Sequence, residues 1–144
     1  MKFENNWKEK TLETLEKEIW GEPEFDSKLV KTCHQLRKKQ LKDFSIEDLR
    51  IMIGQNIGLK FLIPLMIEEL EKDILAEGNF YEGDLLKMVL MSDINYWKKE
   101  KDNWNKICNL FEINKSKIEE FCYQNGYKNE WLNDFEKFMK INSI

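Results

Sequence analysis

The chain has 144 residues, a usual length for one domain, and its 42% hydrophobic and 35% charged residues exclude a disordered chain. The net charge of −4 argues against a nucleic-acid binder, because such proteins need a basic surface to hold phosphates. Only two prolines and six glycines interrupt the sequence, which favours long helices over a turn-rich β fold.

The first helix is predicted to begin near Asn6, which has capping-box spacing with Glu9. Its apolar face runs from Leu12 to Ile19, and Gly21 ends it. We therefore expect a long amphipathic helix at the start of the fold.

Polar residues mark the starts of the next two helices. Asp26 or Ser27 can cap the second helix, and the basic run 37–39 beside its apolar stripe is expected to face water. Ser45 and Asp48 mark a third start, because a serine side chain can accept a hydrogen bond from a backbone N–H three residues on.

A strongly apolar helix is predicted over residues 59–74, and it is the best candidate for the centre of the core. Gly54 and Gly58 before it are interpreted as bracketing a turn, since glycine is costly inside a helix, although their spacing also permits one helical face. Pro64 fits best in the first turn, where its missing N–H costs little; deeper in, it should kink the helix.

The stretch 76–83 is the most loop-like part of the chain. Asp84 can cap the helix that follows it, and Asp93 can cap another, whose apolar stripe runs from Trp97 to Phe111. The second half of the chain is therefore also predicted to be helical.

Two final helices, over about 114–124 and 129–141, are separated by Gly126. No stretch longer than about four residues alternates apolar and polar side chains as a strand does. We predict an all-α, compact bundle of roughly six to eight helices that forms a single domain over residues 1–144.

Few residues have the chemistry for catalysis or metal binding. His34 adjoins Cys33, but adjacent side chains on a helix point about 100° apart and nothing nearby completes a metal site. Cys33, Cys108 and Cys122 are far apart and form no CxxC pair, so we expect reduced thiols. Phosphate-binding, zinc-protease and nucleophile-elbow motifs are absent. The sequence predicts no cofactor, no metal site and no enzyme.

Nothing in the sequence predicts export or membrane insertion. The first residues contain no apolar signal-peptide stretch. The longest apolar run, 61–67, is far too short to span a bilayer. We therefore expect a cytoplasmic protein.

Acidic residues are concentrated between positions 68 and 84, where seven acids and one lysine give a net charge of −6. A solvated helix face is the commonest explanation, and a docking surface for a basic protein is the sharper one, because complementary charge speeds encounter. A further alternative is a small helical hydrolase that uses two of these carboxylates in a cleft. The candidate binding residues of this segment are Glu68, Glu69, Glu71, Asp73, Glu77, Tyr81, Glu82 and Asp84.

Several lysines lie near two tryptophans further along the chain, and this pattern permits another function, that of a nucleic-acid-binding regulator. However, Trp97 and Trp104 share a helical face with Cys108 and Phe111, so both rings are expected to lie in the core. The lysines concerned are Lys98, Lys99, Lys101 and Lys106.

Two segments in the middle of the chain resemble a signature of bacterial immunity proteins. The first is SIEDLRIMIGQNIGLKFLIPL at residues 45–65, and the second is LAEGNFYEGDLL at residues 75–86. These proteins belong to contact-dependent growth inhibition (CDI) systems, and the CdiI-like resemblance covers roughly residues 44–90. The two flanks carry no resemblance.

The resemblance implies a cytosolic immunity protein that binds the C-terminal toxin domain of the effector CdiA and blocks it. Toxins in these systems are often nucleases, frequently RNases that act on transfer RNA. The resemblance supplies no catalytic residue and no cofactor, and we expect a monomer without direct nucleic-acid or membrane contact. The acidic residues and Tyr81 named above become the candidate toxin-binding residues, while Gly78 and Gly83 are interpreted as scaffold.

Overall fold

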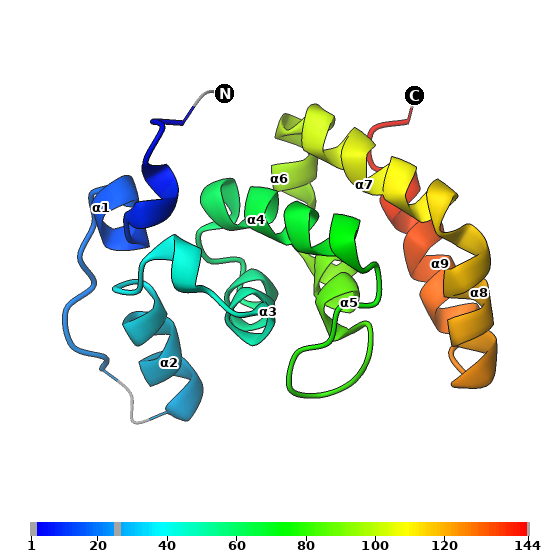
Figure 1. The fold of residues 1–144 in the computed structure, drawn as a ribbon, viewed down its shortest axis with the longest axis horizontal. Coiled ribbons are helices and arrows are strands. Elements are labelled where there is room, and N and C mark those ends of the chain that lie inside the picture. The colour runs from blue at the N-terminus through cyan, green and yellow to red at the C-terminus, as the bar shows by residue number, and fades with distance from the viewer. Residues whose placement is uncertain (1–2, 25–26, 144) are drawn as a thin grey trace.

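The computed structural model describes residues 3–24 and 27–143, and this part of the chain is built from helices without strands (Figure 1). The predicted all-α fold is confirmed: seven of the nine α-helices in the described part have at least seven residues. The α-helices are α1 (Leu12–Glu16), α2 (Lys28–Leu36), α3 (Ile46–Gly54), α4 (Leu59–Lys72), α5 (Asp84–Met91), α6 (Ile94–Lys99), α7 (Lys101–Ile113), α8 (Lys115–Gln124) and α9 (Lys128–Met139), and short 3-10 helices span Trp7–Glu9 and Leu41–Asp43.

Helix α4 lies at the centre of the molecule and packs against both α3 and α7 (Figure 1). Eight of its fourteen residues are buried, as its apolar sequence predicts. In the described part of the chain, no helix is both long enough and apolar enough to cross a membrane.

Pro64 lies inside α4, in the second turn, so the prediction that it belongs to the first turn was wrong. A proline there removes the N–H that would reach the carbonyl of Lys60, which is an exposed residue. The helix continues because the buried residues on both sides of Pro64 hold it in the core.

The turn before α4 follows the prediction. Gly54 ends α3, and Gly58 is the residue that precedes α4. The start of α3 is also as predicted, because Ser45 Oγ accepts from the Asp48 N–H at 3.1 Å and Asp48 Oδ2 accepts from the Ser45 N–H at 3.0 Å.

The N-terminal region differs from its prediction. Asn6 makes no capping hydrogen bond, and α1 begins only after Thr11, whose side chain accepts from the Thr14 N–H. The helix ends after five residues, and Ile19 beyond it is 77% exposed. The long helix predicted from periodicity is therefore wrong.

The difference arises because Arg37, which follows α2, contacts the end of α1 and the segment after it. Arg37, predicted to face water, is 1% exposed, and its guanidinium pairs with Glu16 and donates to the Glu18 carbonyl at 2.7 Å. Its plane also lies over the Trp20 ring, 4.4 Å from the centroid. These contacts hold the chain after α1 in a non-helical path. Ser27 caps α2, as proposed, while the alternative cap Asp26 lies outside the described residues.

The C-terminal half contains α5 to α9. The predicted stripe from Trp97 to Phe111 is divided between α6 and α7, because Glu100 has a non-helical backbone conformation. Asp93 caps α6 as predicted. Helices α8 and α9 pack against each other, and α9 also packs on α5 (Figure 1).

Candidate functional site

The acidic segment from Glu68 to Asp84 runs from the second half of α4, through a projecting loop, into the first turn of α5 (Figure 1). The predicted loop is confirmed, with no helix between Lys72 and Asp84. The structure therefore places the candidate residues on one continuous stretch, but it gives them different environments.

Asp84, the first residue of α5, is buried and binds the backbone of this loop. Its side chain is 1% exposed, and Oδ1 accepts from the Gly78 N–H at 2.6 Å. Oδ2 accepts from the N–H groups of Phe80 and Tyr81 at 3.1 and 3.4 Å. Gly83, and not Asp84, occupies the N-cap position of α5, so the predicted cap was wrong. The carboxylate instead closes the loop before the helix.

Glu47 and Arg50 of α3 also contact this loop. Their side chains form two hydrogen bonds of 2.6 Å each, and Glu47 Oε1 also accepts from the Asn79 N–H at 2.9 Å. The hydrogen bond from Arg50 lowers the pKa of Glu47. The Arg50 guanidinium lies 4.2 Å from the centroid of the Phe80 ring, which is 69% exposed.

The two loop glycines are required by this arrangement. A Cβ atom on Gly78 would lie 2.5 Å from Glu47 Oε1, so a side chain there would displace the carboxylate. Gly83 has a φ of +85°, a conformation that L side chains rarely adopt, and a Cβ there would meet Trp131 at 3.1 Å. We call the contacts of Glu47, Arg50, Gly78 and Asp84 the loop lock.

Three of the candidate acids have partners within the molecule. Glu68 pairs with Lys8 at 2.8 Å, and Glu69 pairs with Lys72 at 3.4 Å. Asp73 lies 3.8 Å from Lys117 of α8, and its Oδ1 accepts from the Leu75 N–H. These pairs offset part of the negative charge that the sequence concentrates here.

The remaining acids are more available to a partner. Glu71, Glu77 and Glu82 are exposed and, among the residues that the structure describes, none of them forms an ion pair. Tyr81 is 36% exposed, and burial raises the pKa of its phenol. The usable acidic surface is therefore smaller than the sequence count indicates.

Residues 14–107, about two thirds of the chain, match a family model described as CDI immunity proteins. The chain belongs to the family of CDI immunity proteins. The resemblance over roughly 44–90 lies inside the matched range and is confirmed. No curated protein and no solved structure matches the chain.

The loop lock explains why the two signature segments of this immunity protein occur together. Arg50 lies in the first segment, and Gly78 and Asp84 lie in the second. The first segment supplies the Glu47–Arg50 pair that holds the loop built by the second. The sequence showed both segments, but it could not show that they meet.

CDI immunity proteins are toxin inhibitors and not enzymes, and membership implies binding of a cognate CdiA toxin. The Cys33–His34 pair has a structural environment: Cys33 is buried, which raises its pKa, and His34 Nδ1 lies 3.1 Å from the Gly21 carbonyl oxygen. Burial also raises the pKa of Cys108 to about 11. No group of three potential metal ligands lies within the described residues.

The tryptophans of the nucleic-acid alternative do not offer stacking platforms. Trp97 is fully buried, and its Nε1–H donates to Ser92 Oγ at 2.8 Å. Trp104 is half-buried, and its Nε1–H donates to the Phe138 carbonyl at 2.9 Å. Trp97 is a core residue of the immunity protein, as its helical spacing predicts, while Trp104 is partly buried and packs against the core.

Lys87 is a connecting residue that sequence reasoning missed. It is 9% exposed, and its Nζ lies 2.5 Å from Asp134 and 3.4 Å from Glu130, both on α9. The ammonium also lies 5.5 Å from the centroid of the Trp131 ring. Lys87 thus joins the α5 end of the loop to α9, which forms the C-terminal hairpin together with α8. Only its position in an apolar helix hinted at burial.

Proposed function

We propose that this immunity protein binds the C-terminal toxin domain of its cognate CdiA in the cytosol and keeps that domain, a nuclease, from its substrate. The family match over residues 14–107 carries the proposal. The single continuous core supports a chain that acts as one domain, and we propose that it acts as a monomer without a cofactor.

The charge of the molecule supports a nuclease as the target. A nuclease must hold phosphates, so its active site tends to be basic. We propose that the fully or partly exposed acids of segment 68–84, with Tyr81, face that surface: Glu68, Glu69, Glu71, Asp73, Glu77 and Glu82. Asp84 supports this surface from inside through the loop lock. An interface of about 800 Å² per partner fits on a domain of this size.

The test is protection in living cells. The CdiA C-terminal domain encoded beside this gene is expressed from an inducible promoter, with and without the immunity protein. We expect growth arrest and cleaved transfer RNA without it, and normal growth with intact transfer RNA when it is present.

A CdiA toxin domain from an unrelated CDI system is the control, and the immunity protein should not protect against it. Failure to protect against the cognate domain would contradict the proposed function. Protection against a toxin that leaves all RNA and DNA intact would contradict the nuclease assignment alone.

A further inference from the structure

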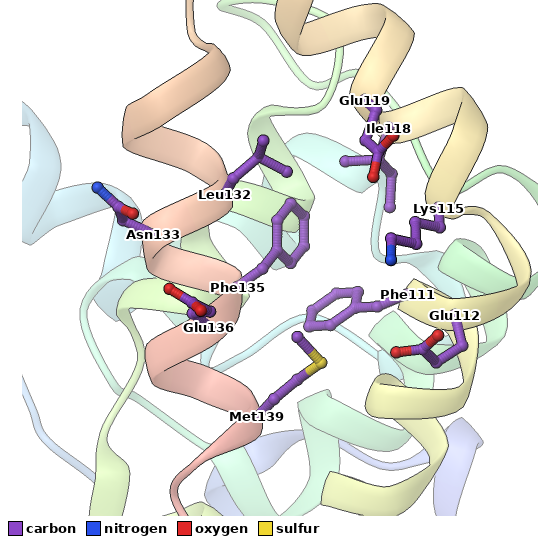
Figure 2. A pocket seen from close by; sticks show the side chains of 10 residues that line it. All are labelled: Phe111, Glu112, Lys115, Ile118, Glu119, Leu132, Asn133, Phe135, Glu136 and Met139. Carbon is purple, nitrogen blue, oxygen red and sulfur yellow. The ribbon is translucent and has the colours of Figure 1, made fainter.

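A concave surface lies between α9 on one side and α7 and α8 on the other (Figure 2). It is an open groove with a volume of about 360 Å³. Asn114, between α7 and α8, lets the chain change direction, so that both helices contribute to one wall.

The floor of the groove is apolar. Phe111 and Phe135 meet edge to face at its centre, with ring centroids 4.3 Å apart (Figure 2). Ile118 lies beside them, and Leu132 from α9 is 37% exposed at the edge. Met139 closes the other end with a flexible side chain. A groove of this kind can accept an apolar side chain from a partner.

The rim of the groove is mainly acidic. Glu112 and Glu119 lie on the α7–α8 wall and Glu136 lies on α9, while Lys115 is the basic residue among the lining residues. Within the part of the chain that the structure describes, none of these three glutamates forms an ion pair. Their charge is therefore available to a basic partner, unlike that of Glu68 and Glu69.

The groove also lies outside the residues that the family model matches. Its residues run from Phe111 to Met139, whereas the family match ends at residue 107. A surface that recognises one toxin and not its relatives must differ between family members. The C-terminal hairpin lies outside the matched residues and is therefore free to differ, whereas the loop lock lies inside them.

We infer that the α7–α8–α9 groove is the specificity-determining part of the toxin interface, and that it takes an apolar side chain carried on a basic segment of the toxin domain. This inference rests on the proposed function. The apolar floor provides burial for one anchor side chain, and the three unpaired carboxylates select and steer the cations beside it.

The first test neutralises the rim. Glu112→Gln, Glu119→Gln and Glu136→Gln are combined, and binding to the cognate CdiA C-terminal domain is measured at low and moderate salt. We expect the affinity to fall about tenfold at low salt, through a slower association rate with a weaker salt dependence. The control combines Glu9→Gln, Asp43→Asn and Asp102→Asn, which changes the net charge equally on other exposed positions. An equal loss in the control would overturn the inference.

The second test places a charge on the apolar edge of the groove. Leu132→Lys places a cation in the groove, and we expect the affinity to fall at least about tenfold with an unchanged melting temperature, because the position is 37% exposed. Ile113→Lys is the matched control, since Ile113 is 78% exposed on α7 and does not line the groove. It should bind as the wild type does.

The outcomes separate this inference from the proposed function. A wild-type chain that neither binds nor protects overturns both. A wild type that binds and protects, with folded groove variants that bind equally well, overturns the groove alone. A wild-type dimer in light scattering that Leu132→Lys converts to a monomer would show a second copy in the groove, and would also overturn the inference.

Discussion

The loop lock and the C-terminal groove both contain carboxylates beside exposed apolar side chains, yet they use those carboxylates differently. In the loop lock, Asp84 accepts three backbone hydrogen bonds and Glu47 is engaged by Arg50 and Asn79. Around the groove, the carboxylates of Glu112 and Glu136 have no ion-pair partner among the described residues. A count of acids along the sequence does not distinguish these two situations.

The difference teaches that the carboxylates of the loop lock shape the backbone, while those around the groove are left for a partner. A carboxylate that is already saturated by internal donors gains little from a partner, because it would have to exchange one set of hydrogen bonds for another. An unpaired carboxylate loses only its hydration when it meets a cation. The following experiments test this division, starting with the largest expected effect.

Asp84→Ala should cause the largest loss of stability. It leaves the N–H groups of Gly78, Phe80 and Tyr81 without their acceptor, and we expect the free energy of unfolding to fall by about 3 kcal/mol. Urea denaturation followed by circular dichroism measures this. Asp84→Asn is the control, because the amide keeps one acceptor oxygen and should recover part of the loss. An unchanged denaturation midpoint in Asp84→Ala would show that the loop lock does not stabilise the fold.

Lys87→Met should have an intermediate effect, because it breaks the link between the two regions. Its partners Asp134 and Glu130 are partly exposed, so we expect a loss of about 1–2 kcal/mol. The affinity for the toxin domain should also fall, since α9 forms one wall of the groove. Calorimetric binding together with thermal unfolding would measure both. Reduced stability with unchanged affinity would show that the α8–α9 hairpin is not part of the toxin interface.

The pH dependence of stability should report on Glu47. Its pKa is lowered in the folded protein by the hydrogen bond from Arg50, from an ordinary value of 4.5. The contribution of the ionised carboxylate is therefore complete well above pH 4.5 and is lost as the pH falls through the lowered pKa. Unfolding measured between neutral and acidic pH should show a steeper acid loss in the wild type than in Glu47→Gln. Parallel curves would contradict this role.

The smallest effect on stability is expected from the unpaired acids of the loop and α4. Combining Glu71→Gln, Glu77→Gln and Glu82→Gln should change the free energy of unfolding by less than about 0.5 kcal/mol, because these side chains are exposed. The association rate with the toxin domain should still fall at low salt if this surface steers encounter. An unchanged rate and salt response would assign steering to the groove alone.

The sequence predicted the helical fold, the burial of α4, the serine cap at Ser45 and the projecting loop, because each depends on local periodicity or a local hydrogen bond. It mispredicted the N-terminal helix, because Arg37 fixes that segment from another part of the chain.

The candidate site was predicted only in part, for the same reason. The sequence located the acidic segment, but the saturation of Asp84 and the pairing of Glu68 with Lys8 depend on where the backbone turns. The groove was missed entirely, since its lining comes from three separate helices and its acids are scattered among ordinary helical residues.

The loop lock also affects the order in which the molecule folds. Within the lock, Asp84 bonds to backbone groups three to six residues away and Glu47 reaches Asn79 across 32 residues, whereas Lys87 reaches Asp134 across 47 residues. Closing a short loop costs less chain entropy than closing a long one, so local contacts form faster. All residues of the lock precede α9 in the chain and are therefore synthesised before it. The lock can therefore organise before the α8–α9 hairpin, which contributes to both walls of the groove, docks onto the rest of the protein.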